Sequence, residues 1–447
     1  MIKGAPYKQI FTINFKLQTI NMKVLFTLII ACCLSIFSSA QKIHKIINAK
    51  KVSRIEKVLA SDDMQGRKTF TPSIDKAADF IASEFKKSGL KYFDGLSNYK
   101  QTFEMKKATT ESASGNMDGA SVDEDKIIAI ASDAEVNFSE NSGFTKVVID
   151  DTANLFKTVF GLMRENKKYL LLVDTSHEKN FQRLKSFNRE SFEEKAPVVL
   201  VLTNENPTTY HFEIKNKITN SSLSNVVGVL PGKTKKDEFV IFSAHYDHLG
   251  IGKPDAKGDS IYNGANDDAA GTTAVIMLAD YFSKLKNNER TLIFVAFTAE
   301  EIGGFGSKYF SKQIEPEKTI AMFNIEMIGT ESKWGKNSAY ITGYEKSNFG
   351  KILQKNLEGS SFHFEPDPYP NQNLFYRSDN ATLAALGVPA HTISTSKMDN
   401  EPNYHKQSDE IETLDMNNMA EIIKAIAISS KTIISGKDTP TRVEKKN

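Results

Sequence analysis

The spacing of hydrophobic positions changes twice along the chain, near residue 105 and near residue 220. Between residues 41 and 105, apolar residues recur close to the 3.6-residue period of a helix. The positions that show this are Ala77, Ala78, Phe80, Ile81, Phe85 and Leu90. Lys86, Lys87 and Gly89 provide the basic last turn and the glycine stop of a helix. This first zone is therefore predicted to be mainly helical.

The second zone, about 106–220, has a different pattern. A polar stretch from Thr109 to Asp125 is followed by short runs typical of strands, with one helical pattern, Ala153–Met163, among them. The strand-like runs are Lys126–Ala131, Tyr169–Val173 and Pro197–Leu202. No cluster of polar groups in this zone suggests chemistry. We interpret it as an inserted β-rich subdomain, lid-like or similar to a protease-associated domain.

The third zone, 221–436, alternates strand-like and helical runs. The strand-like runs are Asn225–Leu230, Phe239–Ala244, Thr291–Thr298, Thr319–Ile325, Ala339–Thr342 and Pro389–Ser394. The helical runs are Ala270–Leu285, Phe305–Lys312, Phe349–Leu357, Ala381–Leu386 and Leu414–Ile434. Such alternation predicts an α/β fold, a doubly wound mixed sheet flanked by helices, completed by residues 41–105. The charged tail, 437–447, is predicted to be disordered.

The first 40 residues are predicted to be a secretory signal peptide. An apolar run from Val24 to Phe37 follows Lys23 and ends in small residues up to Ala40, which is typical of a cleavage site. Met22 is a candidate for the true start. The run is too short for stable membrane insertion. We therefore expect export to the periplasm or the medium, with lipid attachment at Cys32 as the alternative.

Removal of that segment changes the composition of the chain. Both cysteines, Cys32 and Cys33, lie inside it, so the remaining chain has neither disulfides nor cysteine catalysis. Four of the 57 basic residues are also lost, which leaves 53 against 55 acidic residues. This near-neutral balance gives no electrostatic footprint for nucleic acid, and we expect no nucleic-acid partner. The sequence leaves the oligomeric state open.

Histidine and acidic residues stand where the apolar runs of the third zone end. His245 and Asp247 lie two residues apart at the end of one run, so an extended chain points them the same way. A carboxylate so placed orients a metal-binding imidazole; the alternative is a loop histidine, and His248 is a second candidate ligand. Asp267 and Asp268 precede a helix, where either aspartate also serves as an N-cap.

The next apolar runs end in the same way. Glu300 and Glu301 follow one buried run and Glu326 another, and buried carboxylates at strand ends are costly without cations. Adjacent side chains point in different directions, so one glutamate can bind metal while the other takes a proton from water. His405 lies in a loop before Asp409. Imidazoles and carboxylates that converge from several segments are what a water-activating metal centre requires.

These motifs together resemble the zinc-dependent exopeptidases of clan MH. That family includes bacterial leucyl aminopeptidases, glutamate carboxypeptidase and animal-type glutaminyl cyclase. The resemblance covers Asn225 to about Ile434 and reaches the N-terminal stretch Leu59–Arg67.

The resemblance implies two zinc ions per chain. Asp267 bridges them, His245 and Glu326 complete one site, and Glu301 and His405 complete the other. Glu300 is the implied general base, with Asp247 beside His245 in the catalytic set. The resemblance also implies a cis peptide bond after Asp267.

Three positions depart from the family pattern. Glu326 stands where relatives have aspartate, and Asn380 stands where they have histidine. Some relatives place a tyrosine that polarises the substrate carbonyl at the position of Phe375; Tyr376 is the nearest candidate for that substrate-binding role.

The favoured interpretation is a secreted zinc aminopeptidase that acts on peptide substrates. Two alternatives remain: a glutaminyl cyclase or carboxypeptidase on the same scaffold, and a non-catalytic, receptor-like binding domain. Side-chain specificity, and release of single residues or dipeptides, stay open.

Overall fold

The structure is a computed structural model that describes residues 42–185 and 190–446, and it is built around one large sheet. Within these residues the strand order is β16 (His363–Pro366), β15 (Ser338–Ile341), β17 (Ala390–Ser394), β14 (Thr319–Ile325), β10 (Lys235–His245), β13 (Arg290–Phe297), β9 (Tyr210–Leu230), β2 (Lys100–Met117) and β3 (Ala120–Val122). The four strands β17, β14, β10 and β13 are parallel, whereas β15 runs antiparallel to β17 and β9 runs antiparallel to β13. The predicted mixed α/β sheet is thus confirmed.

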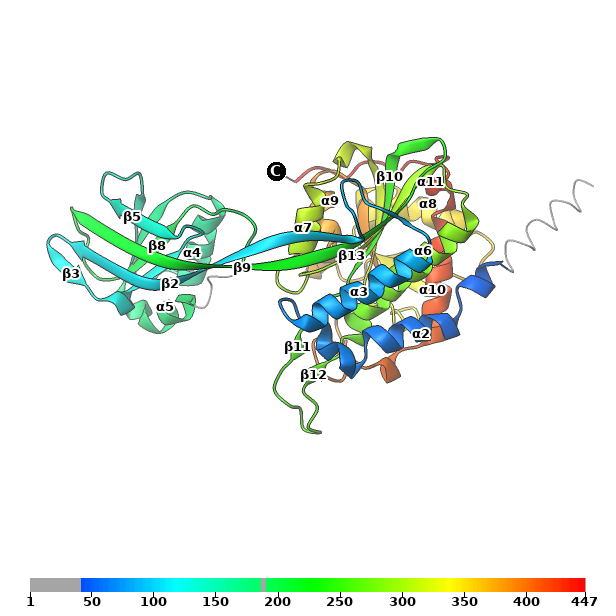
Figure 1. Cartoon of the computed structure of the whole chain (residues 1–447), viewed down its shortest axis with the longest axis horizontal. Helices are drawn as coiled ribbons and strands as arrows, with labels where there is room; N and C mark the ends of the chain where they lie inside the picture. Colours follow the sequence, from blue (N-terminus) through cyan, green and yellow to red (C-terminus); the bar gives the residue numbers. More distant parts are fainter. Residues whose placement is uncertain (1–41, 186–189, 447) are drawn as a thin grey trace, which may run out of the picture.

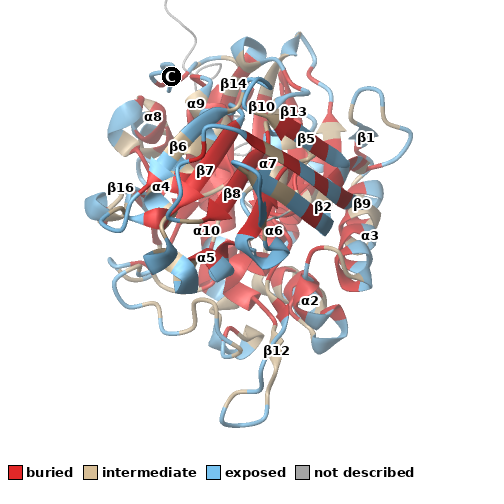
Figure 2. Ribbon diagram, turned by 90° about the vertical axis from the view of Figure 1, so that its left-hand side faces the viewer, coloured by how far each residue is buried: buried red, intermediate tan, exposed pale blue. Residues whose placement is uncertain are grey.

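Alternation along β10 explains why helices cover both faces. Val240, Phe242 and Ala244 enter one hydrophobic core and Ile241 enters the other, as the two-residue period of a strand requires. On the first face lie α2 (Ala49–Leu59), α3 (Pro72–Lys87), α6 (Ala270–Leu285), α8 (Phe349–Asn356) and α10 (Met416–Ser429). On the second lie α7 (Phe305–Ser311) and α9 (Asn380–Ala385). Figure 2 shows the buried residues concentrated on the sheet between these layers.

A second lobe stands apart from this body, joined to it by the long antiparallel ribbon of β2 and β9 (Figure 1). Its four-stranded sheet has the order β4 (Ile127–Ile130), β8 (Val198–Leu202), β7 (Tyr169–Val173) and β6 (Thr145–Ile149). One face packs on α4 (Leu155–Arg164) and α5 (Glu178–Leu184). The other packs on β5 (Glu135–Ser139) and the outer half of the ribbon. We call this the distal lobe.

The sequence predicts no element for the polar stretch 109–125, which lies largely in β2 and β3. One side of this ribbon faces solvent, while Phe103, Met105 and Ala108 are buried at intervals along the other. One expectation differs from the structure: the predicted disordered tail is wrong for residues 437–446. Val443 is buried and Arg442 Nη1 donates to the Thr319 carbonyl at 2.8 Å, so this segment packs beside β14.

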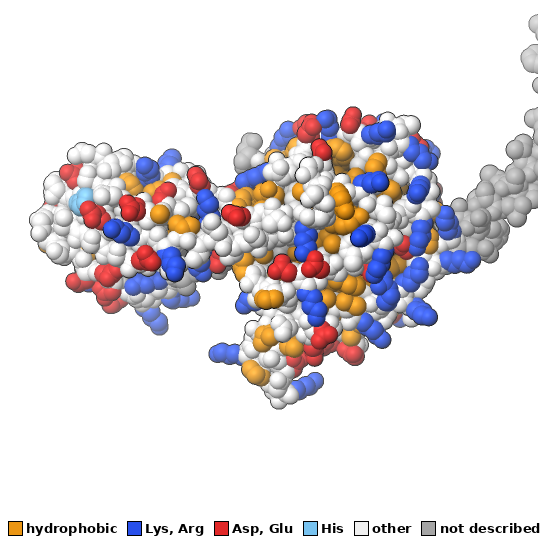
Figure 3. Space-filling view, viewed as in Figure 1, with side chains coloured by type: hydrophobic (Ala, Val, Ile, Leu, Met, Phe, Trp, Pro, Cys, Tyr) orange, Lys and Arg blue, Asp and Glu red, His pale blue; other side chains and the backbone are white. Residues whose placement is uncertain are grey.

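Charge and hydropathy add two facts about the surface. Acidic and basic side chains are interspersed over both lobes on the face seen in Figure 3. Among the described residues, no helix has the length and apolar character needed to cross a bilayer.

Candidate metal centre

The parallel strands bring their carboxyl ends to one edge of the sheet. His245 is the last residue of β10 and pairs with Phe297 of β13, so Glu300 and Glu301 follow only a few residues beyond the same edge. β14 is in register with β10 on the other side, and Glu326 follows it directly. Three segments distant in sequence thus deliver their polar residues to one place, as their positions after apolar runs predicted.

Asp267 is the point where the other groups meet. His245 Nε2 lies 3.2 Å from its Oδ1, and His405 Nε2 lies 3.2 Å from its Oδ2. His405 Nε2 is also 3.2 Å from Glu301 Oε2. These contacts bring together His245, Asp267, Glu301 and His405, four of the five ligands expected from the sequence. The fifth, Glu326, lines the same cavity as Asp267, Glu301 and His405.

The loop that carries Asp267 is held by two buried carboxylates. Asp409 accepts hydrogen bonds from the amides of Asn266 and Asp267 at 2.9 and 3.0 Å. Asp268 accepts from the amides of Met327 at 3.0 Å and of His245 at 3.3 Å, so it connects three ligand-bearing segments. The Asp267–Asp268 peptide bond is cis, as the family resemblance implied. No pattern in the sequence indicates these hydrogen bonds of Asp268 and Asp409.

Asp247 holds the loop that carries the two adjacent glutamates. Its carboxylate accepts from the amides of Glu300 at 3.0 Å and Glu301 at 3.3 Å. The contact that orients His245 differs from the expected one. His245 Nδ1 lies 3.1 Å from the backbone carbonyl of Asp247 and 3.8 Å from its carboxylate. Asp247 therefore positions His245 through its main chain and Glu300 through its side chain.

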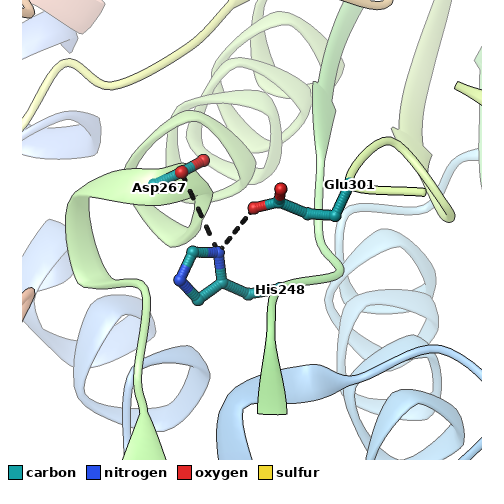
Figure 4. Close-up of side chains that lie close together, drawn as sticks. All are labelled: His248, Asp267 and Glu301. Atoms are coloured by element: carbon teal, nitrogen blue, oxygen red, sulfur yellow. Dashed lines mark hydrogen bonds and ion pairs between the residues drawn. The ribbon is translucent and has the colours of Figure 1, made fainter. Parts of the chain in front are cut away.

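His248 also lies inside the cluster, as Figure 4 shows. Its Nδ1 is 2.8 Å from Glu301 Oε1 and 3.9 Å from Asp267 Oδ2, and the three side chains form a group able to hold a metal ion. His248 is buried and does not line the cavity, whereas His405 does. We therefore interpret His248 as the donor that orients Glu301, and His405 as the ligand.

The residues of this centre fit zinc. Zinc bonds of about 2.0–2.1 Å at tetrahedral angles place neighbouring ligand atoms about 3.3 Å apart, close to the 3.2 Å contacts around Asp267. Glu326 Oε2 is buried without a hydrogen-bond partner among the described residues. Buried carboxylate oxygens need a cation or a donor. Zinc would supply the missing partner of Glu326.

Burial and mutual repulsion dominate the electrostatics. Burial raises the pKa of Glu300, and the neighbouring Glu326 and Asp379 raise it further. Burial likewise raises the pKa of Glu326, and it raises that of Asp379 to about 7. Hydrogen bonds to Asp267 and then to Glu301 raise the pKa of His405 to about 10. Buried carboxylates that repel one another in this way are suited to binding cations.

The cavity beside these groups has a volume of about 60 Å³. Its wall away from the carboxylates is formed by Tyr340, Thr342, Leu374, Arg377, Ser378, Thr392, Ser394, Ser396, Met398 and Tyr404. Tyr404 stacks on the His405 ring at 3.9 Å between centroids. In the sequence, only the position of Tyr404 next to His405 could have indicated that Tyr404 belongs to the cavity.

The substrate-binding role expected of Tyr376 stays a prediction. Tyr376 does not line the cavity; its ring packs against Phe375 and lies 4.2 Å from Lys446 Nζ in the C-terminal segment. Phe375 itself is buried. Asn380, which replaces the family histidine, is also buried and donates to the carbonyls of Phe375 and Ala390. Asn380 therefore serves to hold the backbone around α9.

Comparison with known proteins agrees with this fold and site. Residues 225–429 match peptidase family M28. An aminopeptidase of Bacillus subtilis (strain 168), YwaD, is 29% identical over 124 residues, which cover 27% of this chain and 24% of that protein. A probable leucine aminopeptidase of Trichophyton verrucosum (strain HKI 0517) is 27% identical over 209 residues, 45% of this chain and 54% of that protein. The chain thus spans about half or less of the length of these curated relatives.

Solved structures extend the similarity of fold to most of the chain. An aminopeptidase from Aneurinibacillus sp. strain AM-1 has a TM-score of 0.52 at 17% identity, with 90% of this chain and 96% of that one covered. A zinc aminopeptidase from Bacillus subtilis has the same TM-score and identity, with 87% and 95% covered. The resemblance to zinc-dependent exopeptidases is confirmed over residues 225–429, which match peptidase family M28.

Proposed function

We propose that the protein is a zinc-dependent aminopeptidase that removes N-terminal residues from peptides. The observation that carries this proposal is the convergence of His245, Glu301, Glu326 and His405 on Asp267, with Glu300 beside them in one cavity. The M28 match and the aminopeptidases among the relatives support it.

The donor set suits two zinc ions that share Asp267. His245 and Glu326 would hold one ion, and Glu301 and His405 the other. Zinc at such a site polarises a carbonyl and lowers the pKa of water.

Glu300 is placed to move protons in the reaction. It lines the cavity, and the Asp247 carboxylate holds its backbone amide at 3.0 Å, so its position is fixed without occupying its own carboxylate. The raised pKa of Glu300 favours taking a proton from the attacking water and passing it to the leaving amine. Tyr404 and His405, stacked on each other, also line the cavity.

We also propose export of the protein through the signal-like segment that ends near Ala40, which lies outside the described residues. The absence of cysteine beyond Cys33 is compatible with an oxidising compartment. N-terminal sequencing of the mature protein tests this: a chain that begins near Gln41 supports export, and one that retains residues 24–40 contradicts it.

A substrate panel tests the proposed activity. Short peptides and aminoacyl chromogenic substrates with a free N-terminus should be hydrolysed, and their N-acetylated counterparts should not. A chelator should abolish turnover and added zinc restore it. Ring closure of N-terminal glutamine with release of ammonia would favour a cyclase instead, and release of C-terminal residues a carboxypeptidase. Zinc binding without turnover of any substrate would favour a binding domain.

A further inference from the structure

A fully buried arginine lies directly behind the metal centre. Arg67 is 0% exposed and ends the short helical turn Asp62–Arg67 between α2 and α3. Three consecutive residues of this turn have positive φ: Gln65 at 48°, Gly66 at 65° and Arg67 at 47°. A Cβ on Gly66 would lie 2.5 Å from the Tyr262 carbonyl oxygen, so the position requires glycine. The backbone is thus bent tightly to bring Arg67 inward.

The guanidinium of Arg67 donates to backbone carbonyls of the two loops that carry ligands. Nε donates to Tyr246 at 2.8 Å, directly after His245. Nη1 donates to Asn263 at 2.5 Å, and Nη2 donates to Gly264 at 2.9 Å, both just before Asp267.

Three further contacts complete the set. Nη1 also donates to the Leu59 carbonyl at 2.7 Å, which ties Arg67 to the end of α2, and Nη2 also lies 3.5 Å from the Asp267 carbonyl. The backbone carbonyl of Arg67 accepts from the amide of His248 at 3.2 Å. Arg67 therefore contacts the strand end that carries His245 and His248 and the turn that carries Asp267.

None of the hydrogen bonds recorded for Arg67 within the described residues goes to a carboxylate. In a surface ion pair, the charge of an arginine is what matters. Here the planar guanidinium of Arg67 holds several carbonyls in one fixed arrangement. Lysine has three donors on one nitrogen and cannot span them. The arrangement thus depends on the shape of the guanidinium.

We propose that Arg67 is a positioning residue that sets the distance between His245 and Asp267 and so preforms the zinc site. This inference rests on the proposed zinc-dependent function. It accounts for the tight turn at Gly66 and for a buried charge without a hydrogen-bonded carboxylate. Groups that orient metal ligands typically change metal affinity or activity by about 10–100-fold when they are removed.

The test compares Arg67→Lys with Arg290→Lys. Arg290 is also buried, 2% exposed, and donates to the Ile433 and Asp438 carbonyls, but it opens β13 at the opposite end from the metal centre. Zinc affinity of chelator-treated protein is measured by competition with a chromophoric chelator, together with urea unfolding. Arg67→Lys should weaken zinc binding about 10–100-fold, whereas Arg290→Lys should lose stability but keep its zinc affinity.

Kinetics at saturating zinc provide a second readout. Arg67→Lys should lower kcat with KM within about twofold of wild type, because the cavity wall that receives substrate is untouched. Unchanged zinc affinity and kcat in Arg67→Lys, or an equal loss of affinity in Arg290→Lys, would overturn the proposal.

Glu56→Gln tests whether the local charge, rather than the shape of the Arg67 guanidinium, determines zinc affinity. Glu56 is buried, and its carboxylate accepts from Thr273 Oγ1 and faces the charge of Arg67 without a hydrogen bond to it. Burial raises the pKa of Glu56 to about 8, so above pH 8 the amide removes a negative charge while it keeps the guanidinium and its carbonyl contacts. Zinc affinity within about threefold of wild type supports positioning by shape, and a loss as large as that of Arg67→Lys refutes it.

If Arg67→Lys does not fold, hydrogen exchange of the wild-type protein decides the question. The His248 amide, bonded to Arg67, should stay protected with and without zinc, because Arg67 rather than metal holds the site. Loss of that protection on zinc removal would overturn the proposal. The zinc measurements do not depend on turnover, so a protein that binds zinc as expected but cleaves no peptide would refute the proposed activity and leave the role of Arg67 standing.

Discussion

At the scale of single residues, the centre depends on carboxylates with different tasks. Asp267 faces two histidines, Asp268 and Asp409 hold its loop, and Glu300 lines the cavity. The surroundings of each group, rather than its residue type, assign its role. Glu300 and Glu301 are adjacent in sequence, yet only Glu301 contacts His248 and His405.

We predict that Glu300→Gln leaves folding and zinc content intact but lowers kcat for peptide hydrolysis about 10²–10⁴-fold. The amide has nearly the same shape but cannot accept the proton of the attacking water. Steady-state kinetics and elemental analysis of the same preparation measure both properties. Glu345→Gln, at a side chain 75% exposed, is the matched control and should behave as wild type. Turnover by Glu300→Gln near the wild-type rate would remove Glu300 from the mechanism.

The two histidines near Glu301 should respond differently to truncation. His405→Ala removes a group equally close to Asp267 and Glu301 and should cost one zinc ion per chain. His248→Ala removes only a donor to Glu301 and should retain both ions with about 10-fold weaker binding. Elemental analysis after dialysis distinguishes them. Loss of an ion from the His248 variant alone would exchange the two assignments.

At the scale of elements, β17 contributes a buried histidine that is not part of the metal centre. His391 Nδ1 lies 2.8 Å from the Thr342 carbonyl and Nε2 lies 2.7 Å from Ser347 Oγ. The neutral ring satisfies both contacts, donating to the carbonyl and accepting from the hydroxyl. Burial lowers the pKa of His391 to about 4.

This pKa predicts a pH dependence of stability. His391 has a lower pKa in the folded than in the unfolded chain, where it is about 6.5, so the unfolded state binds more protons between those values. Its contribution is fully present above pH 6.5 and is lost as pH falls toward 4, by up to about 3 kcal/mol. Urea unfolding of chelator-treated protein at a series of pH values measures it. His391→Gln should show a flatter profile, and identical slopes in both proteins would contradict the assigned cause.

Phe192 and Glu193 carry contacts between the distal lobe and the body, and Lys312 Nζ donates to Glu193 at 2.8 Å. Phe192 packs edge-on against Phe103 and Tyr309, with ring centroids 6.0 and 5.9 Å apart, and Lys312 Nζ lies 4.7 Å above its ring. Tyr309 belongs to α7, which begins a few residues after Glu301. Phe192 thus connects the distal lobe to α7, the helix that follows the loop carrying Glu300 and Glu301.

We predict that Phe192→Ala loosens this contact by about 1–2 kcal/mol while the body stays folded. Hydrogen exchange should increase in residues 190–196 and at the start of α7, without change in α6 or α10. Phe156→Ala, within the distal lobe and away from α7, is the control and should leave α7 unaffected. No change in exchange at α7 in the Phe192 variant would show that the lobe is held elsewhere.

At the scale of the whole molecule, features that follow from the order of neighbouring residues along the chain could be predicted from the sequence. Glu300, Glu301 and Glu326 each follow a buried strand, and parallel strands must bring such residues to one edge, so the metal centre could be predicted. The role proposed for Arg67 could not, because it lies in contacts with carbonyls up to 200 residues away, which leave no pattern in the sequence. The long ribbon was missed because its exposed side is polar. The tail was mispredicted because Val443 packs only against distant elements.

The most direct test of the account is a zinc titration of chelator-treated protein, followed by release of the N-terminal residue from a short peptide. We predict that activity rises until two equivalents of zinc are bound and then stays constant, and that Asp267→Ala shows no activity at any zinc concentration. Full activity at one equivalent, or hydrolysis that persists without zinc, would contradict the shared site at Asp267.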